Sequence, residues 1–248
     1  MSTITVGLAC EDNGHFSAVT CLVDATLVAR HEWLDGILEH CRLWRGLTED
    51  AAWYKFDPSD AYDLRPFIIG GRKISMQGHI DGQPLKPEAG MWRKVLLMFC
   101  HRDPRPDVVI LARDMDGYPE RLAGIVQVRD GLPWPFKVAV AMADPEIEAW
   151  HVAGFTPEGP DEQGRLDALQ RELSFDPTTQ SHRLTAHPND ARTDAKRVLE
   201  HLCGADQRRR EACLVDHIIL RQRGAANGMN AFLDEIDEHV VPVFRAPR

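Results

Sequence analysis

Two short apolar runs constrain the fold of this chain most strongly. Residues 107–112 (DVVILA) and 137–143 (KVAVAMA) are rich in branched side chains and, after their first residues, contain no polar side chain. Runs of this length and composition are typical of strands buried on both faces, as in parallel sheets. A helical pattern over Pro119–Val128 separates them. Strands that alternate with helices in this way predict an α/β fold with a parallel sheet flanked by helices.

The remaining residues before Gly154 fit the same class. Their apolar spacing predicts a strand over Thr3–Cys10 and helices over Phe16–Leu27, Trp33–Cys41 and Glu88–His101. A further short helix is expected to begin near Asp144 and to run through Trp150. Residues 46–86 are irregular and rich in turn-forming glycine and proline. We therefore predict one α/β domain over residues 1–155, with an insertion at about 46–86.

The C-terminal part has a different character. After Gly154 the chain is polar and irregular to about Asp190. Helical patterns then follow at Ala191–Cys203, Asp206–Arg223 and Ala226–Val240. The expectation is a mostly helical part over residues 156–248 that packs on the first domain.

Composition places the chain among soluble globular proteins. Hydrophobic residues make up 44% and charged residues 27% of the 248 residues. No stretch approaches the roughly 18 apolar residues of a membrane span, and the N-terminus lacks a signal-peptide pattern. We expect a cytoplasmic protein without membrane contact. Six cysteines without a CxxC pair are expected to be buried free thiols: Cys10, Cys21, Cys41, Cys100, Cys203 and Cys213.

Acidic residues stand where the expected strands end. They are Glu11 after the first strand, Asp114 and Asp116 after the second, and Asp144, Glu146 and Glu148 after the third. Because the carboxyl ends of parallel strands share one edge of the sheet, these carboxylates are expected to gather there. Such a gathering is unfavourable unless a cation neutralises it, and hard oxygen ligands select Mg²⁺ or Mn²⁺.

The DxDG sequence at residues 114–117 admits several interpretations. In an extended segment Asp114 and Asp116 would point to the same side, and Gly117 would let the backbone turn away. Either aspartate could instead cap the following helix. Similar sequences occur in calcium loops, haloacid-type phosphatases and glycosyltransferases. The calcium loop is excluded here because Ile125 stands where its last glutamate would be.

The combination of strand ends resembles the TOPRIM domain of topoisomerases, primases and OLD-type nucleases. The matching residues are Glu11 in VGLACEDNGH, and Asp114 and Asp116 in VVILARDMDG. In that family the corresponding glutamate and aspartates hold magnesium at the edge of a small parallel sheet. The long gap between the two motifs corresponds to the insertion. The resemblance covers about residues 1–155 and 187–202.

Two further segments extend the resemblance to TOPRIM-like phage-defence proteins. AMADPEIEAWHVAG resembles an acidic motif and nominates Glu146 and Glu148 as metal ligands. HPNDARTDAKRVLEHL is similar to a lysine-bearing motif and nominates Lys196 for offsetting transition-state charge. The implied catalytic set is Glu11, Asp114, Asp116, Glu148 and Lys196.

The resemblance implies a nuclease that uses Mg²⁺ or Mn²⁺ to cleave DNA or RNA. It also implies a setting in bacterial antiphage defence and an ATPase partner protein, while homo-oligomerisation stays open. Two alternatives remain: a non-catalytic binding or assembly subunit, and a metal-dependent phosphatase or nucleotide hydrolase. The net charge of −9 counts against a simple electrostatic grip on nucleic acid.

Several other residues have an ordinary interpretation beside a functional one. They include two histidines that could act as bases, and basic residues that could contact phosphate or simply lie on a solvated surface. These residues are His15 and His187, Arg113, Gly70–Lys73 (GGRK) and Arg208–Arg210 (RRR). The GGRK segment lacks the spacing of a phosphate-binding loop, so a turn is the preferred interpretation.

Overall fold

A parallel sheet forms the centre of the molecule. The computed structural model describes residues 3–48, 50–57, 67–69, 72–75, 78–187 and 191–246. Five strands form the sheet: β1 (Ile4–Cys10), β2 (Arg42–Arg45), β3 (Tyr54–Lys55), β8 (Val108–Asp114) and β9 (Lys137–Ala143). Their order is β2-β1-β8-β9, β3 also pairs with β1, and every pairing is parallel. The α/β class and the parallel sheet predicted from the sequence are confirmed.

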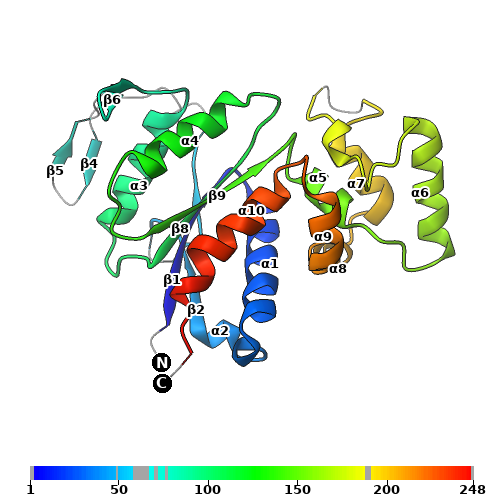
Figure 1. Cartoon of the computed structure of the whole chain (residues 1–248), viewed down its shortest axis with the longest axis horizontal. Coiled ribbons are helices and arrows are strands. Elements are labelled where there is room, and N and C mark those ends of the chain that lie inside the picture. Colours follow the sequence, from blue (N-terminus) through cyan, green and yellow to red (C-terminus); the bar gives the residue numbers. More distant parts are fainter. Residues whose placement is uncertain are drawn as a thin grey trace.

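Helices cover both faces of the sheet, as Figure 1 shows. One face, which we name the α1 face, packs against α1 (Asn13–Arg30), α10 (Met229–Glu235) and a π-helical turn, η4 (Ile236–Val240). The other, the α3 face, packs against α3 (Ala89–Cys100) and α4 (Glu120–Asp130). Strand residues alternate between the two cores, so that Val108, Ile110 and Ala112 lie on the α1 face while Val109 and Leu111 lie on the α3 face.

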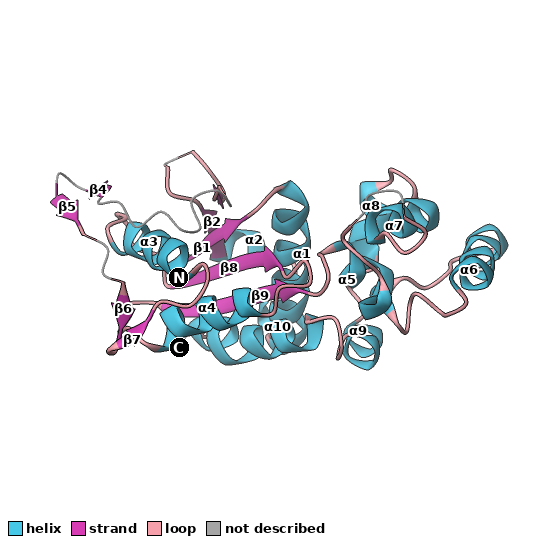
Figure 2. Ribbon diagram, turned by 90° about the horizontal axis from the view of Figure 1, so that it is seen from above, coloured by secondary structure: helices cyan, strands magenta, loops and turns pink. Residues whose placement is uncertain are grey.

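Most of the remaining helices form a lobe beyond one end of the sheet. This helical lobe comprises α5 (Glu148–Gly154), α6 (Pro160–Leu173), α7 (Ala195–Cys203), α8 (Gln207–Ala212), α9 (His217–Arg223) and the 3-10 turn Ser181–Arg183. Figure 2, seen from above, shows β8 and β9 running toward the lobe. The carboxyl ends of the strands therefore face the helical lobe. The predicted acids lie between these strand ends and the lobe.

Several expectations for individual elements are wrong. The second N-terminal helix is two single turns, Glu32–Leu34 and α2 (Leu38–Cys41), because Gly36 between them takes a φ of 71°. The irregular stretch before residue 190 contains the 14-residue helix α6. The helix expected over Asp206–Arg223 is divided, because Asp216 caps α9 by accepting hydrogen bonds from two backbone N–H groups.

The expected insertion holds only short strands among its described residues. They are β3, which joins the central sheet beside β1, and two antiparallel pairs, β4 (Phe67–Ile69) with β5 (Arg72–Ile74) and β6 (His79–Ile80) with β7 (Gln83–Pro84). The sequence did not predict the edge strand β2, which lies just before this region. Gly70 and Gly71 of the GGRK segment lie outside the described residues, so the turn expected there stays a prediction.

The helical part after residue 155 also contributes to the core of the sheet. α10 and η4 return to the sheet and pack against β9, and Phe232 also stacks on Trp150 of α5 with ring centroids 5.5 Å apart. The last part of the chain, the 3-10 turn Val241–Val243 included, thus completes the α1 face.

The six cysteines are free thiols, four of them buried and two, Cys21 and Cys100, partly buried. Among the helices that the structure describes, none combines the length and apolar character needed to cross a membrane.

Candidate functional site

The loop after β8 is tied to the end of β9. The Met115 N–H donates to the carbonyl of Ala143 (2.7 Å), and the Asp116 N–H donates to the carbonyl of Pro145 (2.9 Å). β8 ends at Asp114, and Asp116 takes a left-handed φ of 50°. The extended geometry expected for Asp114 and Asp116 is therefore wrong. The two carboxylates instead reach groups on opposite faces of the sheet.

Asp114 lies at the centre of the gathered side chains. Its Oδ1 accepts a hydrogen bond from the Ile147 N–H at 2.8 Å and lies 3.0 Å from Nε2 of His15. Its own N–H donates to Oε1 of Glu11 at 3.3 Å. The Asp114 residue is only 7% exposed. The ends of β1, β8 and β9 thus meet at this residue, as the strand-end pattern predicted.

His15 links Asp114 to the start of α1. Its Nδ1 lies 2.9 Å from Oδ1 of Asp12, the residue that caps α1, and the histidine is 1% exposed. Burial acts to lower the pKa of His15, but the hydrogen bonds to Asp114 and Asp12 outweigh it and raise the pKa to about 10. His15 is therefore a buried cation between two carboxylates near neutral pH. From the sequence, His15 was nominated only as a possible base.

Two arginines neutralise the acids on the α3 face. Arg113 places Nη1 3.0 Å from Oε1 of Glu11 and Nη2 2.8 Å from Oε1 of Glu88. Arg121 places Nε 3.2 Å from the same Glu88 oxygen and pairs through Nη1 with Asp116 at 2.5 Å. The sequence nominated Arg113 only as a phosphate contact or an ion-pair partner, and the structure shows it in two ion pairs. The sequence did not single out Glu88 or Arg121.

The acids after β9 form the third part of the site. Oε2 of Glu146 accepts a hydrogen bond from Nζ of Lys196 at 3.0 Å, and this contact joins α7 of the lobe to the sheet edge. The Glu146 side chain is 2% exposed, whereas that of Lys196 is 58% exposed. The acidic motif and the lysine-bearing motif, which are 50 residues apart in the chain, are thus brought into direct contact.

Burial perturbs both glutamates. It raises the pKa of Glu146, against the effect of Lys196. Burial, together with the charge of Glu146, raises the pKa of Glu148 to about 7. Burial acts to lower the pKa of Lys196, but Glu148 and Glu146 outweigh it, and the net shift is upward. A pKa near neutrality makes Glu148 suited to hold or release a proton.

Two observations bear on whether a metal ion fits these residues. Oε1 of Glu146 and Oε2 of Glu148 are buried and have no hydrogen-bond partner in the part of the chain that the structure describes. Buried carboxylate oxygens without a donor favour a cation beside them, and hard oxygen donors fit Mg²⁺ or Mn²⁺. Within the described ranges, however, no three His, Cys, Asp or Glu side chains are grouped so that they could hold an ion. Glu146 and Glu148 are the acids with unpartnered buried oxygens, whereas arginines already neutralise Glu11 and Asp116.

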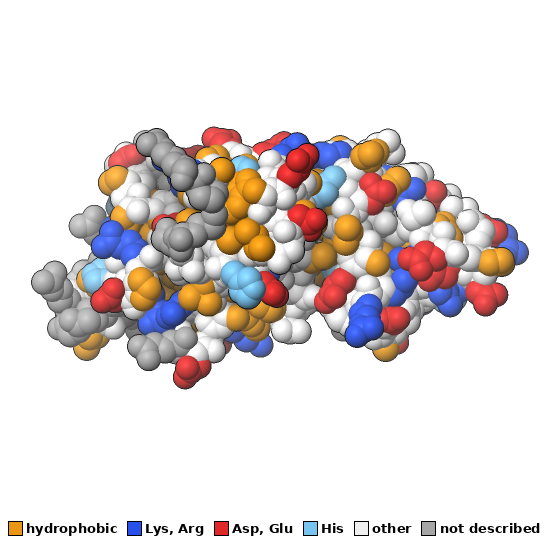
Figure 3. Space-filling view, turned by 90° about the horizontal axis from the view of Figure 1, so that it is seen from below, with side chains coloured by type: hydrophobic (Ala, Val, Ile, Leu, Met, Phe, Trp, Pro, Cys, Tyr) orange, Lys and Arg blue, Asp and Glu red, His pale blue; other side chains and the backbone are white. Residues whose placement is uncertain are grey.

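The remaining candidates have structural partners or lie on the surface. Arg209 forms a two-point ion pair with Glu162 (2.9 and 2.8 Å), and Arg210 donates to the carbonyl of Gly204. Both therefore hold the lobe together. His187 and Arg208 are exposed. On the face shown in Figure 3, the described basic side chains are interspersed with acidic ones and form no continuous basic stripe.

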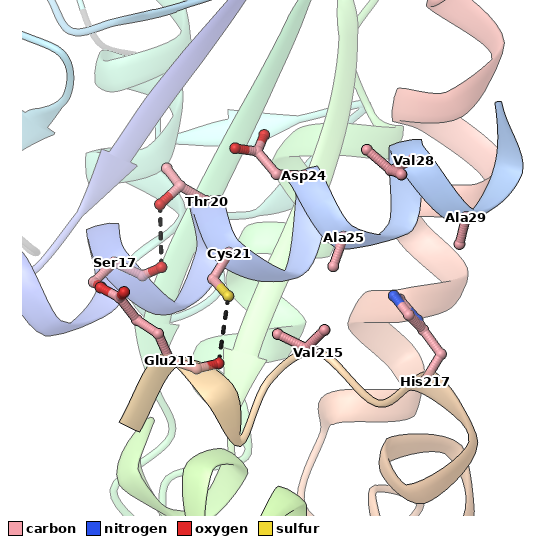
Figure 4. Close-up of a pocket in the computed structure, with 10 residues that line it drawn as sticks. All are labelled: Ser17, Thr20, Cys21, Asp24, Ala25, Val28, Ala29, Glu211, Val215 and His217. Atoms are coloured by element: carbon pink, nitrogen blue, oxygen red, sulfur yellow. Dashed lines mark hydrogen bonds between the residues drawn. The ribbon is translucent and has the colours of Figure 1, made fainter. Parts of the chain in front are cut away.

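A groove of about 650 Å³ lies away from these acids, between α1 and the segment around α8 and α9. Figure 4 shows its lining, in which the Cys21 thiol donates to the carbonyl of Glu211. None of the ten lining residues belongs to the predicted site. The acids at the strand ends, and not this groove, therefore form the candidate site.

Comparison with known proteins gives no relative. No protein-family model, no curated protein and no solved structure matches the chain.

Proposed function

We propose that this protein is a TOPRIM-like phosphodiester hydrolase that cleaves DNA or RNA with Mg²⁺ or Mn²⁺. The observation that carries the proposal is the meeting of acids from three strand ends around Asp114, with unpartnered buried oxygens on Glu146 and Glu148. A site of this kind at the carboxyl edge of a parallel sheet is where α/β enzymes bind their ligands.

The residues have distinct roles in this proposal. Asp114, Glu146 and Glu148 would hold the ion, and Glu11 and Asp116 would join them on exchanging their arginine partners. When bound, a divalent cation neutralises charge on a phosphoryl group and lowers the pKa of water. Glu148 holds or releases a proton at its carboxylate, since its pKa is about 7. Lys196, which is exposed beside Glu146, presents a positive charge to a phosphate.

The defence setting and the ATPase partner belong to the proposal through the resemblance alone. A second candidate function is a non-catalytic assembly subunit on the same scaffold. The ion pairs of Arg113 with Glu11 and of Arg121 with Asp116 favour it, because they neutralise two of the expected ligands without any metal.

A cleavage assay tests the proposal. Purified protein is incubated with plasmid, single-stranded DNA or RNA in Mg²⁺ or Mn²⁺, beside Asp114→Asn, Glu148→Gln and Lys196→Met. Each variant is expected to lose about 100-fold or more in rate, because each removes a group worth about 3 kcal/mol of transition-state stabilisation. Glu162→Gln, which breaks an ion pair within the lobe, is the matched control and is expected to retain activity.

The outcomes separate the alternatives. Cleavage that persists in Asp114→Asn and Glu148→Gln would overturn the site. Metal-dependent phosphate release from nucleotides, without polymer cleavage, would point to the phosphatase alternative. Inactivity on every substrate, with a stable complex to another protein, would support the assembly subunit.

A further inference from the structure

Two free thiols of the helical lobe are in contact with each other. Cys203 ends α7, Cys213 caps the end of α8, and their Sγ atoms lie 3.9 Å apart. Both residues are buried, Cys203 at 8% and Cys213 at 1% exposure. Bonded sulfurs stand about 2.0 Å apart, so side-chain rotation has to close a gap of only about 2 Å. The two thiols are therefore close enough for a bond to form after small side-chain movements.

The backbone around both cysteines is held by close contacts. A Cβ on Gly154 of α5 would stand 1.7 Å from the carbonyl oxygen of Cys213, so α5 packs directly on this residue. The carbonyl of Gly204, next to Cys203, accepts hydrogen bonds from Nε (3.1 Å) and Nη2 (2.7 Å) of Arg210. Because these bonds already join the end of α7 to α8, the two thiols are kept beside each other in the folded lobe.

A largely buried arginine lies beside the pair. Nη1 of Arg209 donates to Sγ of Cys213 at 3.7 Å, and the Arg209 side chain is 12% exposed. The hydrogen bond with Cys213 lowers the pKa of Cys203, and the charge of Arg209 acts in the same direction, against burial. The same hydrogen bond, together with burial, raises the pKa of Cys213. Because the thiolate is the reactive form, Cys203 is the thiol that reacts first.

We propose that Cys203 and Cys213 are a modification site, at which hydrogen peroxide converts the two thiols reversibly into a disulfide. Peroxide suits a thiol that is 8% exposed, because it is hardly larger than water. The Cys203 sulfur attacks one peroxide oxygen, the O–O bond breaks, and water leaves, so that Cys203 becomes a sulfenic acid. The Cys213 sulfur then attacks the Cys203 sulfur, the S–S bond forms, and the S–O bond breaks to release a second water, which takes the Cys213 proton.

The reaction balances without a further reactant. The two thiols lose two electrons and two protons, and peroxide takes up both to become two waters. A dithiol reductant restores the thiols by thiol–disulfide exchange. The new bond ties α7 to α8, and α7 also carries Lys196, which contacts Glu146 at the sheet edge. Oxidation therefore restricts the helix that joins the lobe to the sheet, whatever the acids there do.

Peptide mapping after oxidation tests the site. Wild type, Cys203→Ser, Cys213→Ser and Cys100→Ser are treated with hydrogen peroxide, unfolded, alkylated, digested and analysed by mass spectrometry. In wild type we expect two of the six thiols to escape alkylation and a peptide linked through Cys203 and Cys213, with both thiols restored by dithiothreitol. Cys100→Ser, which removes a partly buried thiol of α3, is the matched control and is expected to form the same link. Dimedone, a reagent for sulfenic acids, is expected to label Cys203 in Cys213→Ser.

Thermal unfolding gives a second readout. A cross-link that closes a loop of the chain stabilises a fold, so oxidised wild type is expected to unfold roughly 5 °C above the reduced protein. Neither serine variant of the pair should show this shift, and Cys100→Ser should show it in full. Both thiols still open to alkylation at a peroxide concentration that oxidises Cys100 would overturn the proposal, and so would a link from either thiol to another cysteine. If a serine variant does not fold, the mapping of wild type decides alone.

Discussion

At the scale of single residues, the charges near Asp114 are arranged in pairs. Asp114 faces His15, Glu11 faces Arg113, Asp116 faces Arg121, and Glu146 faces Lys196. Glu148 differs, because no ion pair links it to a cation in the described chain. Burial is therefore the main influence on the Glu148 carboxyl, and the pKa of this carboxyl rises from the ordinary value of 4.5 to about 7.

This raised pKa predicts how stability depends on pH. Below about pH 4.5 the Glu148 carboxyl is protonated in both the folded and the unfolded chain. As the pH rises, the unfolded chain releases the proton first, so the folded state loses stability until about pH 7. The loss is at most about 3 kcal/mol, since one pKa unit corresponds to about 1.4 kcal/mol.

Glu148→Gln removes this loss. Between pH 5 and pH 8, in EDTA, we expect its unfolding free energy to increase relative to wild type by about 1–3 kcal/mol. Urea denaturation at each pH measures the difference. Glu200→Gln, an exposed substitution on α7, is the control and should show a constant difference. If the difference in unfolding free energy between Glu148→Gln and wild type were also constant with pH, it would contradict a raised pKa of Glu148.

At the scale of elements, the strands that carry the acids are the best predicted. β9 has the bounds expected from its apolar run, and β8 extends the predicted strand to Asp114. Signals for α6 were present as well: proline at its start, acidic residues in its first turn, and leucines at 166, 169 and 173. β2 gave little signal, because it has four residues and only Trp44 is buried.

The close approach of α4 to the start of α3 gives an element-scale prediction. Gly124→Ala would place a Cβ 1.9 Å from the carbonyl oxygen of Pro87, so the helices must separate. We expect a loss of about 1–3 kcal/mol in unfolding free energy. Gly164→Ala on α6 is the matched control, because its Cβ would meet nothing within 4 Å. There the better helix propensity of alanine should stabilise the fold by up to about 1 kcal/mol. Equal effects of the two substitutions in urea denaturation would refute the close approach.

At the scale of the whole molecule, the end of the chain completes the central core. Phe232 is fully buried in the core of the α1 face, whereas Leu169 is fully buried in the separate core of the helical lobe. Along the sequence, the lobe therefore lies between two segments that both belong to the sheet domain. Its Lys196 reaches back to Glu146, so the candidate site depends on how the lobe sits against the sheet.

A pair of cavity substitutions tests this division. Phe232→Ala is expected to cost about 3–5 kcal/mol and to increase hydrogen exchange in β9. Leu169→Ala is expected to cost about 2–5 kcal/mol and to increase exchange first in α6 and α7. Exchange followed by mass spectrometry locates each change. Loosening of the lobe alone by Phe232→Ala, with β9 still protected, would contradict this division.

The sequence by itself determined the α/β class, the strands that end in acids, and the nomination of Glu146 and Lys196. These follow from local periodicity and from the rule that parallel strands share a carboxyl edge. Only the tertiary structure decided which charges pair. Glu88, Arg121 and His15 join the site through contacts between elements, and 99 residues separate His15 from Asp114 in the chain. The tertiary structure also decided where the Asp116 side chain points, because the loop that carries it is hydrogen-bonded to the end of β9 and is not extended.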